Sequence, residues 1–420
     1  MVDKQNTLLR QPGFLKLWIG QSVSVIGSQI SGLAFPVLAV TYLHANEFEM
    51  GLLNAADTSA FLVFGLLAGA LVDRWVKRKV MLVADLVRMV AVAVIPILWM
   101  LGVLNIYHLI VIGAVLSIAT VFFDVSYQSY IPILLPKEYI GVGNARLETS
   151  SQISGIAGPG IVGALLNIFK APVLLIFDAA SFFVSALSLW FIKDREQPKP
   201  KEDRKPLKTE IAEGLKFVWN QKLIRAISFT TSTSNLFGTV VGTMFALYLL
   251  SPKNLNLSVT SFGILMSIGS IGGLIGATAT PRLIKLVGEG PLVVWSALLS
   301  GAVQFLIPLA WDIPREWSLV PLAGQAFFTS FFALTYNITQ VTARQRLCPE
   351  HLLGRMNASI RFMVWGSMPI GALISGVLGT VFGVLPTIWI GCIFGLFCAG
   401  FVFFSPLRTM RQMPDKPDDY

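Results

Sequence analysis

Two acidic residues lie deep inside long apolar runs of this sequence, where ionisable side chains are rare. Neither Asp57 nor Asp124 has a lysine or arginine within four positions along the chain. A carboxyl group in such surroundings can load and release protons near neutral pH, because burial disfavours its charged form. We therefore predict that these two residues couple proton movement to the work of the protein. The alternative is a hydrogen-bonded carboxyl group that only packs.

Polar side chains recur at helical spacing in four apolar runs. The four stripes are Gln21, Ser24, Ser28 and Ser31; Thr120, Asp124, Tyr127 and Gln128; Thr231, Asn235, Gly238 and Gly242; and Tyr336, Asn337 and Gln340. Lipid offers such groups no hydrogen-bond partner, so they should face protein or a water-filled cavity. The candidates for contact with a substrate are Gln21, Ser24, Ser28, Tyr127, Gln128, Asn235, Tyr336, Asn337 and Gln340. Hydrogen bonding from helix to helix is the alternative.

A dense group of charges separates two of the apolar runs. It comprises Asp73, Arg74, Lys77, Arg78 and Lys79, and Gly69 precedes it. Each charge would cost roughly 2.5–3.5 kcal/mol in hydrocarbon, so this stretch is expected to be a tight turn at a membrane face. Asp85 and Arg88 follow it, one helical turn apart, and we expect them to join Asp73 and Arg74 in a gate network with a conformational role.

The elements that carry these residues are apolar segments long enough to cross a membrane. The 420-residue chain is 54% hydrophobic and 13% charged, which is too apolar for a soluble domain. Twelve spans are expected, at 14–42, 50–72, 80–101, 106–133, 142–169, 171–192, 224–250, 259–280, 290–311, 318–343, 356–382 and 384–405. The fold class is thus an all-α membrane protein.

The distribution of basic residues predicts the orientation of these spans. With the N-terminus inside, the outer loops keep only Lys170, Lys253 and Arg315, and almost all other lysines and arginines face the cytoplasm. This asymmetry places both termini in the cytoplasm of a multi-pass protein of the cell (inner) membrane. It also explains the net charge of +9 as a matter of topology, so no nucleic acid partner is expected.

A charged, proline-broken segment divides the chain into two parts. We expect a six-helix bundle over 1–192, a cytoplasmic linker over 193–222, a second six-helix bundle over 223–407 and a cytoplasmic tail over 408–420. Within the linker, apolar residues at helical spacing predict an amphipathic helix on the inner membrane surface.

The two parts are related by an internal repeat. Pro136, Gly141, Asn144 and Ala145 recur 213 positions later as Pro349, Gly354, Asn357 and Ala358, and the same offset joins Gly158 to Gly371 and Gly163 to Gly376. Six spans in each half and a parallel repeat predict two pseudo-symmetric bundles with a substrate cavity near mid-membrane.

These features resemble the major facilitator superfamily. Gly69, Leu71, Asp73, Arg74, Lys77 and Arg78 match its G-x-L-a-D-R-x-G-R-K loop, with Val76 in place of a glycine. Gly158, Pro159 and Gly163 resemble the G-x-x-x-G-P-x-x-G-G motif of its exporters, although Ser154 and Val162 replace two glycines. The stretch after the fourth span is most similar to the drug/proton antiporter branch that includes the macrolide efflux proteins and the enterobactin exporter.

The resemblance implies secondary active export of amphiphilic small molecules, drugs or siderophores, by alternating access with proton antiport. The partners would be the substrate, protons and membrane lipid, and the protein would act as a monomer. An uncoupled facilitator or a lipid or lysolipid translocase of the same fold is the alternative. No cluster of nucleophile, base or metal ligands at one depth suggests an enzyme, and no cofactor or metal is expected. The fourth span lacks the arginine that many proton-driven exporters of this family carry there.

Overall fold

The structure is a computed structural model that describes residues 11–72, 74–193, 196, 207–349 and 352–412. These residues form helices and connecting turns, and no β-strand occurs among them, which confirms the predicted all-α class. Eleven helices of the described chain are long and apolar enough to cross a membrane. The remaining predicted span is a 26-residue helix whose first turn carries Glu47 and Glu49.

The helices follow the predicted segments closely. In the first half they are α2 (Pro12–Val37) with the π-helical turn η1 (Leu38–Tyr42), α3 (Glu47–Val72), α4 (Lys77–Met100), α5 (Ile106–Leu134), α6 (Lys137–Leu165) and α7 (Ala171–Trp190). In the second half they are α9 (Lys222–Leu250), α10 (Val259–Val287), α11 (Glu289–Val303) continued by α12 (Leu306–Leu309) and η3 (Ala310–Asp312), α13 (Leu319–Leu347), α14 (Leu353–Phe382) and α15 (Val384–Cys398) continued by α16 (Gly400–Phe403) and η5 (Pro406–Thr409).

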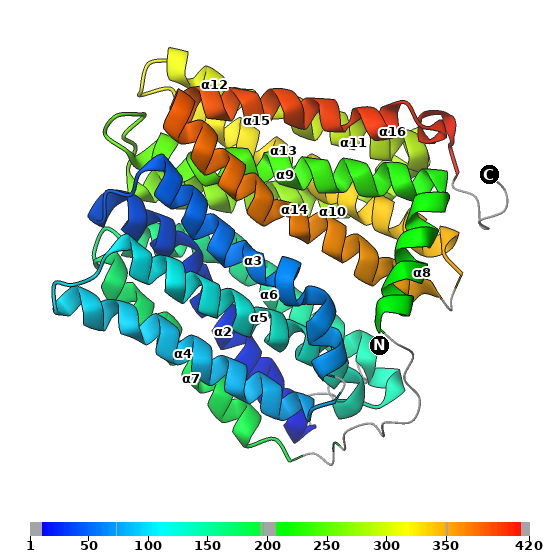
Figure 1. The fold of residues 1–420 in the computed structure, drawn as a ribbon, viewed down its shortest axis with the longest axis horizontal. Helices are drawn as coiled ribbons and strands as arrows, with labels where there is room; N and C mark the ends of the chain where they lie inside the picture. Colours follow the sequence, from blue (N-terminus) through cyan, green and yellow to red (C-terminus); the bar gives the residue numbers. More distant parts are fainter. Residues whose placement is uncertain (1–10, 73, 194–195, 197–206, 350–351, 413–420) are drawn as a thin grey trace. The chain divides into compact units, whose positions relative to one another are not determined.

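The chain divides into two compact units (Figure 1). The first comprises 1–45 and 56–203, and the second comprises 46–55 and 204–420. The sequence does not predict that the beginning of α3 belongs to the second unit. Close contact explains this assignment, because a Cβ added to Gly51 would lie 2.6 Å from the Cα of Gly376 on α14.

Within the first unit, α2 packs against α6 and α7, and α4 packs against α5 and α7. Small residues allow the approach of α2 to α7. A Cβ on Gly20 or Gly27 would lie 2.0 Å from the hydroxyl oxygen of Ser188 or Ser181, respectively. Close backbone approach through small residues is the usual means of joining helices in a membrane, where the hydrophobic effect does not drive their association.

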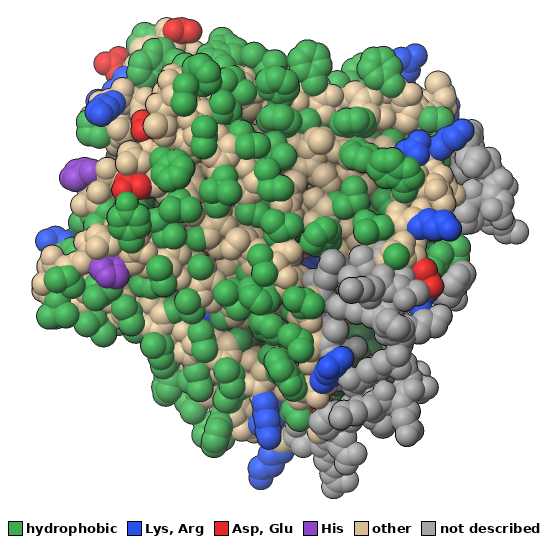
Figure 2. Space-filling model, viewed as in Figure 1, with side chains coloured by type: hydrophobic (Ala, Val, Ile, Leu, Met, Phe, Trp, Pro, Cys, Tyr) green, Lys and Arg blue, Asp and Glu red, His purple; other side chains and the backbone are tan. Residues whose placement is uncertain are grey.

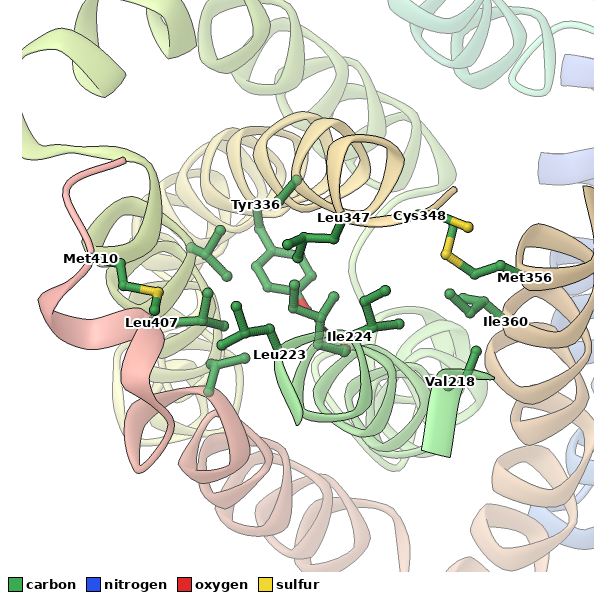
Figure 3. Close-up of a cluster of buried hydrophobic side chains, with 14 of the residues drawn as sticks. Val218, Leu223, Ile224, Tyr336, Leu347, Cys348, Met356, Ile360, Leu407 and Met410 are labelled. Carbon is green, nitrogen blue, oxygen red and sulfur yellow. Dashed lines mark hydrogen bonds between the residues drawn. The ribbon is translucent and has the colours of Figure 1, made fainter. Parts of the chain in front are cut away.

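Within the second unit, α9 packs against α14 and α15, and α13 packs against α10 and α11. Buried apolar side chains join the start of α9 to the ends of its neighbours, with Tyr336, Leu347 and Leu407 around Leu223 and Ile224 (Figure 3). The pairings of the first span with the fifth and sixth, and of the third span with the fourth, thus occur in both units.

The internal repeat also preserves a particular helix contact. A Cβ on Gly158 of α6 would lie 2.5 Å from Cγ of Gln29 on α2. At the position 213 residues later, a Cβ on Gly371 of α14 would lie 2.3 Å from the backbone oxygen of Leu236 on α9. Each of these glycines lies within two positions of a helix-internal proline, Pro159 in α6 and Pro369 in α14. The repeated glycines therefore serve the same contact between the first and fifth spans of each unit.

The predicted amphipathic helix is present as α8 (Leu207–Asn220), which packs against α14 and α9. Arg355 of α14 donates a hydrogen bond to Glu213, and a Cβ on Gly214 would lie 2.5 Å from the backbone oxygen of Arg355. Residues 197–206 of the predicted linker and 413–420 of the predicted tail lie outside the described residues. Figure 2 shows hydrophobic side chains over most of the visible face, with charged side chains gathered near the helix ends, as expected for membrane-spanning helices.

Candidate functional site

The second unit contains a cavity of about 680 Å³. Its walls come from α9, α11, α13, α14 and α15, with one side chain from the part of α3 that belongs to this unit. The hydroxyl and amide groups on the lining belong to Asn54, Thr230, Thr231, Ser234, Asn235, Thr239, Ser300, Gln304, Thr329, Tyr336 and Asn337. Phe237, Trp365 and Met368 supply large apolar surfaces, and no described lining residue carries a formal charge.

Helix α9 presents its predicted polar stripe to this cavity. Thr231, Asn235, Gly238 and Gly242 all line it. The Thr231 hydroxyl lies 2.8 Å from the hydroxyl of Tyr336, and Asn235 Nδ2 donates to the backbone oxygen of Val364 at 3.2 Å. A Cβ on either glycine would meet no atom within 4 Å. The two glycines therefore leave open space in the cavity wall that any larger side chain would occupy.

Helix α13 contributes Tyr336 and Asn337 to the lining, whereas Gln340 is not part of it. Gln340 is only 1% exposed and donates from Nε2 to Asn337 Oδ1 at 2.9 Å. This contact orients the Asn337 side chain, because the amide oxygen that accepts the bond is then fixed. Gln340 therefore contacts a residue of the cavity wall, and its own contact with a substrate stays a prediction.

Several lining residues are not among those predicted from the sequence. Ser300 and Gln304 lie one helical turn apart at the end of α11, so the spacing that revealed the other stripes would have revealed them as well. Phe237, Trp365 and Met368 carry no such signal, since apolar residues in an apolar run look alike whether they face lipid, protein or a cavity.

The predicted cavity residues of the first unit lie on α2 and α5. Ser24 is buried, Ser28 and Gln128 are exposed, and Tyr127 is half-buried and stacks on Phe123 with ring centroids 6.0 Å apart. The amide oxygen of Gln21 is buried and has no hydrogen-bond partner among the described residues. None of these side chains lines the cavity of the second unit, and their contact with a substrate stays a prediction.

The candidate coupling residues lie on two helices of the first unit. Asp57, on α3, is exposed, whereas Asp124, on α5, is half-buried. Asp178 of α7 has a different environment. It accepts hydrogen bonds from Ser31 of α2 and from Ser181 of its own helix. Asp178 therefore joins α2 to α7, which supports a packing role for its carboxyl group.

Asp85 and Arg88 form a buried ion pair on α4. Asp85 is fully buried and Arg88 is 6% exposed. The Arg88 guanidinium carbon lies 4.1 Å from the ring centroid of Phe123 and 4.6 Å from that of Phe182. Arg74 is exposed, and Asp73 lies outside the described residues, so the predicted network with these two residues is untested. What is observed is a pair of opposite charges enclosed by two aromatic rings, which ties α4 to α5 and α7.

The basic loop is bound to the chain that follows α7 through one glutamate. Glu196 accepts hydrogen bonds from the backbone amides of Lys77 at 2.9 Å and Arg78 at 3.3 Å. The Lys77 ammonium lies 3.2 Å from Glu196 Oε1, and these side chains are 6% and 1% exposed. Glu196 thus caps the N-terminus of α4, where otherwise unpaired amides and the helix dipole favour an anion.

The second unit has an equivalent contact made by the backbone. The amides of Glu289 and Gly290, at the start of α11, donate to the backbone oxygens of Arg411 and Met410, each at 3.0 Å. Gly290 lies 213 positions after Lys77, the offset of the internal repeat. In both units, therefore, the chain leaving the sixth span is hydrogen-bonded to the beginning of the third.

Comparisons with known proteins agree with this architecture. Residues 17–370 match the family model described as Major Facilitator Superfamily. The chain is 26% identical over 374 residues to the multidrug efflux pump Tap of Mycolicibacterium fortuitum, covering 86% of this chain and 88% of that protein. It is 22% identical over 386 residues to macrolide efflux protein A of Streptococcus pyogenes, covering 88% and 90%.

Solved structures share the fold. A bacterial homologue of the iron transporter ferroportin, crystallised in an inward-facing state, superimposes with a TM-score of 0.75 at 17% sequence identity. The match covers 94% of this chain and 98% of that one. At this level of identity the likeness concerns the arrangement of helices alone.

Proposed function

The chain belongs to the major facilitator superfamily, and from that membership we propose that it is a secondary active exporter of amphiphilic small molecules. As a member of this family it is a multi-pass membrane transporter and not an enzyme. In our proposal the cargo is a drug-like or siderophore-like molecule, and the protein works by alternating access of its two halves in exchange for protons.

The observation that carries the proposal is the composition of the cavity in the second unit. Hydroxyl and amide groups line it together with the aromatic rings of Phe237, Tyr336 and Trp365, and no described lining residue is charged. Sugars need many convergent hydrogen-bond donors, and small anions need a buried cation. A lining of this kind suits an uncharged or weakly charged molecule with rings and a few polar groups. The names of the relatives, which are efflux proteins for multiple drugs and for macrolides, support the same class of cargo.

Proton coupling is proposed to involve Asp57 and Asp124. Both are carboxylic acids in membrane-spanning helices, and such groups commonly mark proton pathways in transporters. Asp178 is a weaker candidate, because two serines already hold its carboxyl group. Asp85 is a weaker candidate for a similar reason, since Arg88 neutralises it. The Gly158, Pro159 and Gly163 motif, the basic loop and the monomeric state stay predictions.

The test is export of a fluorescent amphiphile from proteoliposomes, with and without an imposed pH gradient. The native chain is compared with Asp57→Asn and Asp124→Asn, and Asp312→Asn in the exposed η3 turn serves as the control. We expect gradient-driven export in the native chain and the control, with loss in at least one of the two test variants. Export that ignores the gradient and tolerates both substitutions would reject proton antiport and favour a facilitator or a lipid translocase.

A further inference from the structure

A second hollow, of about 680 Å³, lies in the first unit on α4 and α5. We name it the α4–α5 groove. Val80, Val83, Ala84 and Val87 form one wall, and Val115, Ile118, Ala119 and Phe122 form the other. Each set follows the spacing i, i+3, i+4, i+7, so each helix presents one continuous apolar stripe to the groove. Val83, Val87 and Val115 are 56%, 39% and 37% exposed, so the groove is open along its length.

One end of this groove is basic. Arg74, Trp75, Val76 and Lys79 line it there, where the turn from α3 enters α4. Trp75 closes that end against the groove wall, with its ring centroid 6.2 Å from that of Phe122. An aromatic ring beside basic side chains at the end of an apolar stripe is typical of the membrane interface.

The basic residues of this loop fall into two groups, one bound to protein groups and one exposed on the groove. Lys77 is bound by Glu196, and Arg78 donates to the backbone oxygens of Leu189 and Trp190. Arg74 and Lys79 are instead exposed and lie on the groove. Neither forms an ion pair with any residue that the structure describes. Two cations are thus directed to the open end of an apolar channel and away from the helix contacts.

The length of the groove matches one leaflet of a bilayer. From Lys79 to Val87 the rise along α4 is about 12 Å, at 1.5 Å per residue. Half the hydrocarbon thickness of a bilayer is about 15 Å. A chain of methylene groups starting at the basic end would therefore remain within the groove for most of the depth of its own leaflet.

We propose that the α4–α5 groove is a binding site for an anionic phospholipid. One acyl chain lies between the two apolar stripes, and the phosphate lies at Arg74 and Lys79. The argument for this occupant is charge complementarity at one end combined with an apolar wall of leaflet depth. Among the residues that the structure describes, a neutral substrate would leave both cations without a counter-charge, and a free phosphate would leave the valines exposed. The site is separate from the cavity of the second unit and does not depend on the proposed cargo.

The site can be tested by native mass spectrometry of the full chain in detergent, titrated with phosphatidylglycerol or phosphatidylcholine. A basic residue at an anionic membrane surface contributes about fivefold in affinity, so Arg74→Gln with Lys79→Gln should weaken phosphatidylglycerol binding by about 30-fold. Phosphatidylcholine binding should change little. Val83→Trp should weaken both lipids by obstructing the acyl-chain channel. This exposed position should tolerate the larger side chain.

Matched controls make the outcome decisive. Lys285→Gln removes an exposed lysine from the last turn of α10, and Val111→Trp enlarges a 62% exposed valine of α5 outside the groove. We expect neither to change the affinity for either lipid. The proposal is overturned if Lys285→Gln weakens phosphatidylglycerol binding as much as the loss of Arg74 and Lys79. It is also overturned if Val83→Trp binds as the native chain does, or if glycerol 3-phosphate binds as tightly as the lipid.

Discussion

Glu196 offers a direct test of how the basic loop is held in the first unit. Its carboxylate accepts two backbone amides at the start of α4 and pairs with the Lys77 ammonium in a nearly solvent-free position. Glu196→Gln keeps the size of the side chain but removes its charge and one of its two acceptor oxygens. One backbone amide of α4 then faces the NH2 group of the glutamine side chain, which can only donate, and the Lys77 ammonium loses its counter-charge.

The expected effect follows from these contacts. Hydrogen bonds to charged groups contribute about 1.5–3 kcal/mol each. Breaking a buried ion pair by removing one partner costs about 3–5 kcal/mol, because the other charge stays buried. Since the two contributions overlap in the same carboxylate, we expect the first turn of α4 to lose about 3 kcal/mol of local stability. This corresponds to roughly 100-fold faster opening.

Hydrogen–deuterium exchange measures this local opening directly. We expect amide exchange in a peptide covering Lys77–Leu82 to accelerate by roughly 100-fold in Glu196→Gln. Glu289→Gln is the matched control, because Glu289 begins the third span of the second unit and pairs with Arg346, and these side chains are 13% and 42% exposed. Such a pair is more open to solvent than Lys77 and Glu196, and a solvent-exposed pair contributes at most about 1 kcal/mol, so exchange at the start of α11 should rise less than about fivefold. Equal effects in the two variants would refute the assignment of Glu196 as a buried cap.

Three further predictions concern the second unit. Gly238→Phe should fold normally but abolish transport, because a Cβ at position 238 points into open cavity space. Gly371→Ala should lower the melting temperature, because a Cβ at position 371 would lie 2.3 Å from the Leu236 backbone oxygen. Transport and thermal stability assays separate the two effects, and a destabilised Gly238→Phe would contradict the cavity assignment. Burial raises the pKa of the Cys348 thiol to about 11. In a chain that carries Cys392→Ala and Cys398→Ala, alkylation of Cys348 by N-ethylmaleimide should therefore be slow at pH 7.5, and its rate should rise about tenfold per pH unit up to that pKa. Rapid labelling at pH 7.5 would contradict this environment.

Much of the fold follows from local features of the sequence. Apolar runs of membrane-spanning length are bounded by charge, proline or glycine, and these signals place every predicted span on an observed helix. Differences arise at the ends, as at α10, which continues to Val287 through Arg282 and Lys285. Polar residues at the end of a span can extend a helix into water, so hydropathy alone ends it too early.

The candidate site was predictable only in part. The stripe of Asn235, Gly238 and Gly242 was visible because one helix face determines it, and the structure places all three on a cavity. Gln340 belongs to a similar pattern, yet it is buried against Asn337. Spacing along one helix defines a face, but the neighbouring helices decide whether that face meets a cavity or another side chain.

Membrane-spanning helices, an internal repeat and a basic loop could all be predicted from the chain, because each depends on composition and on spacing along the sequence. How the members of one charged cluster differ depends on tertiary packing. Lys77 is buried against Glu196, 119 positions away, while Lys79 opens onto the α4–α5 groove. The two lysines differ because residues close together on a helix point in different directions, and the packing of distant segments determines which partner each side chain meets.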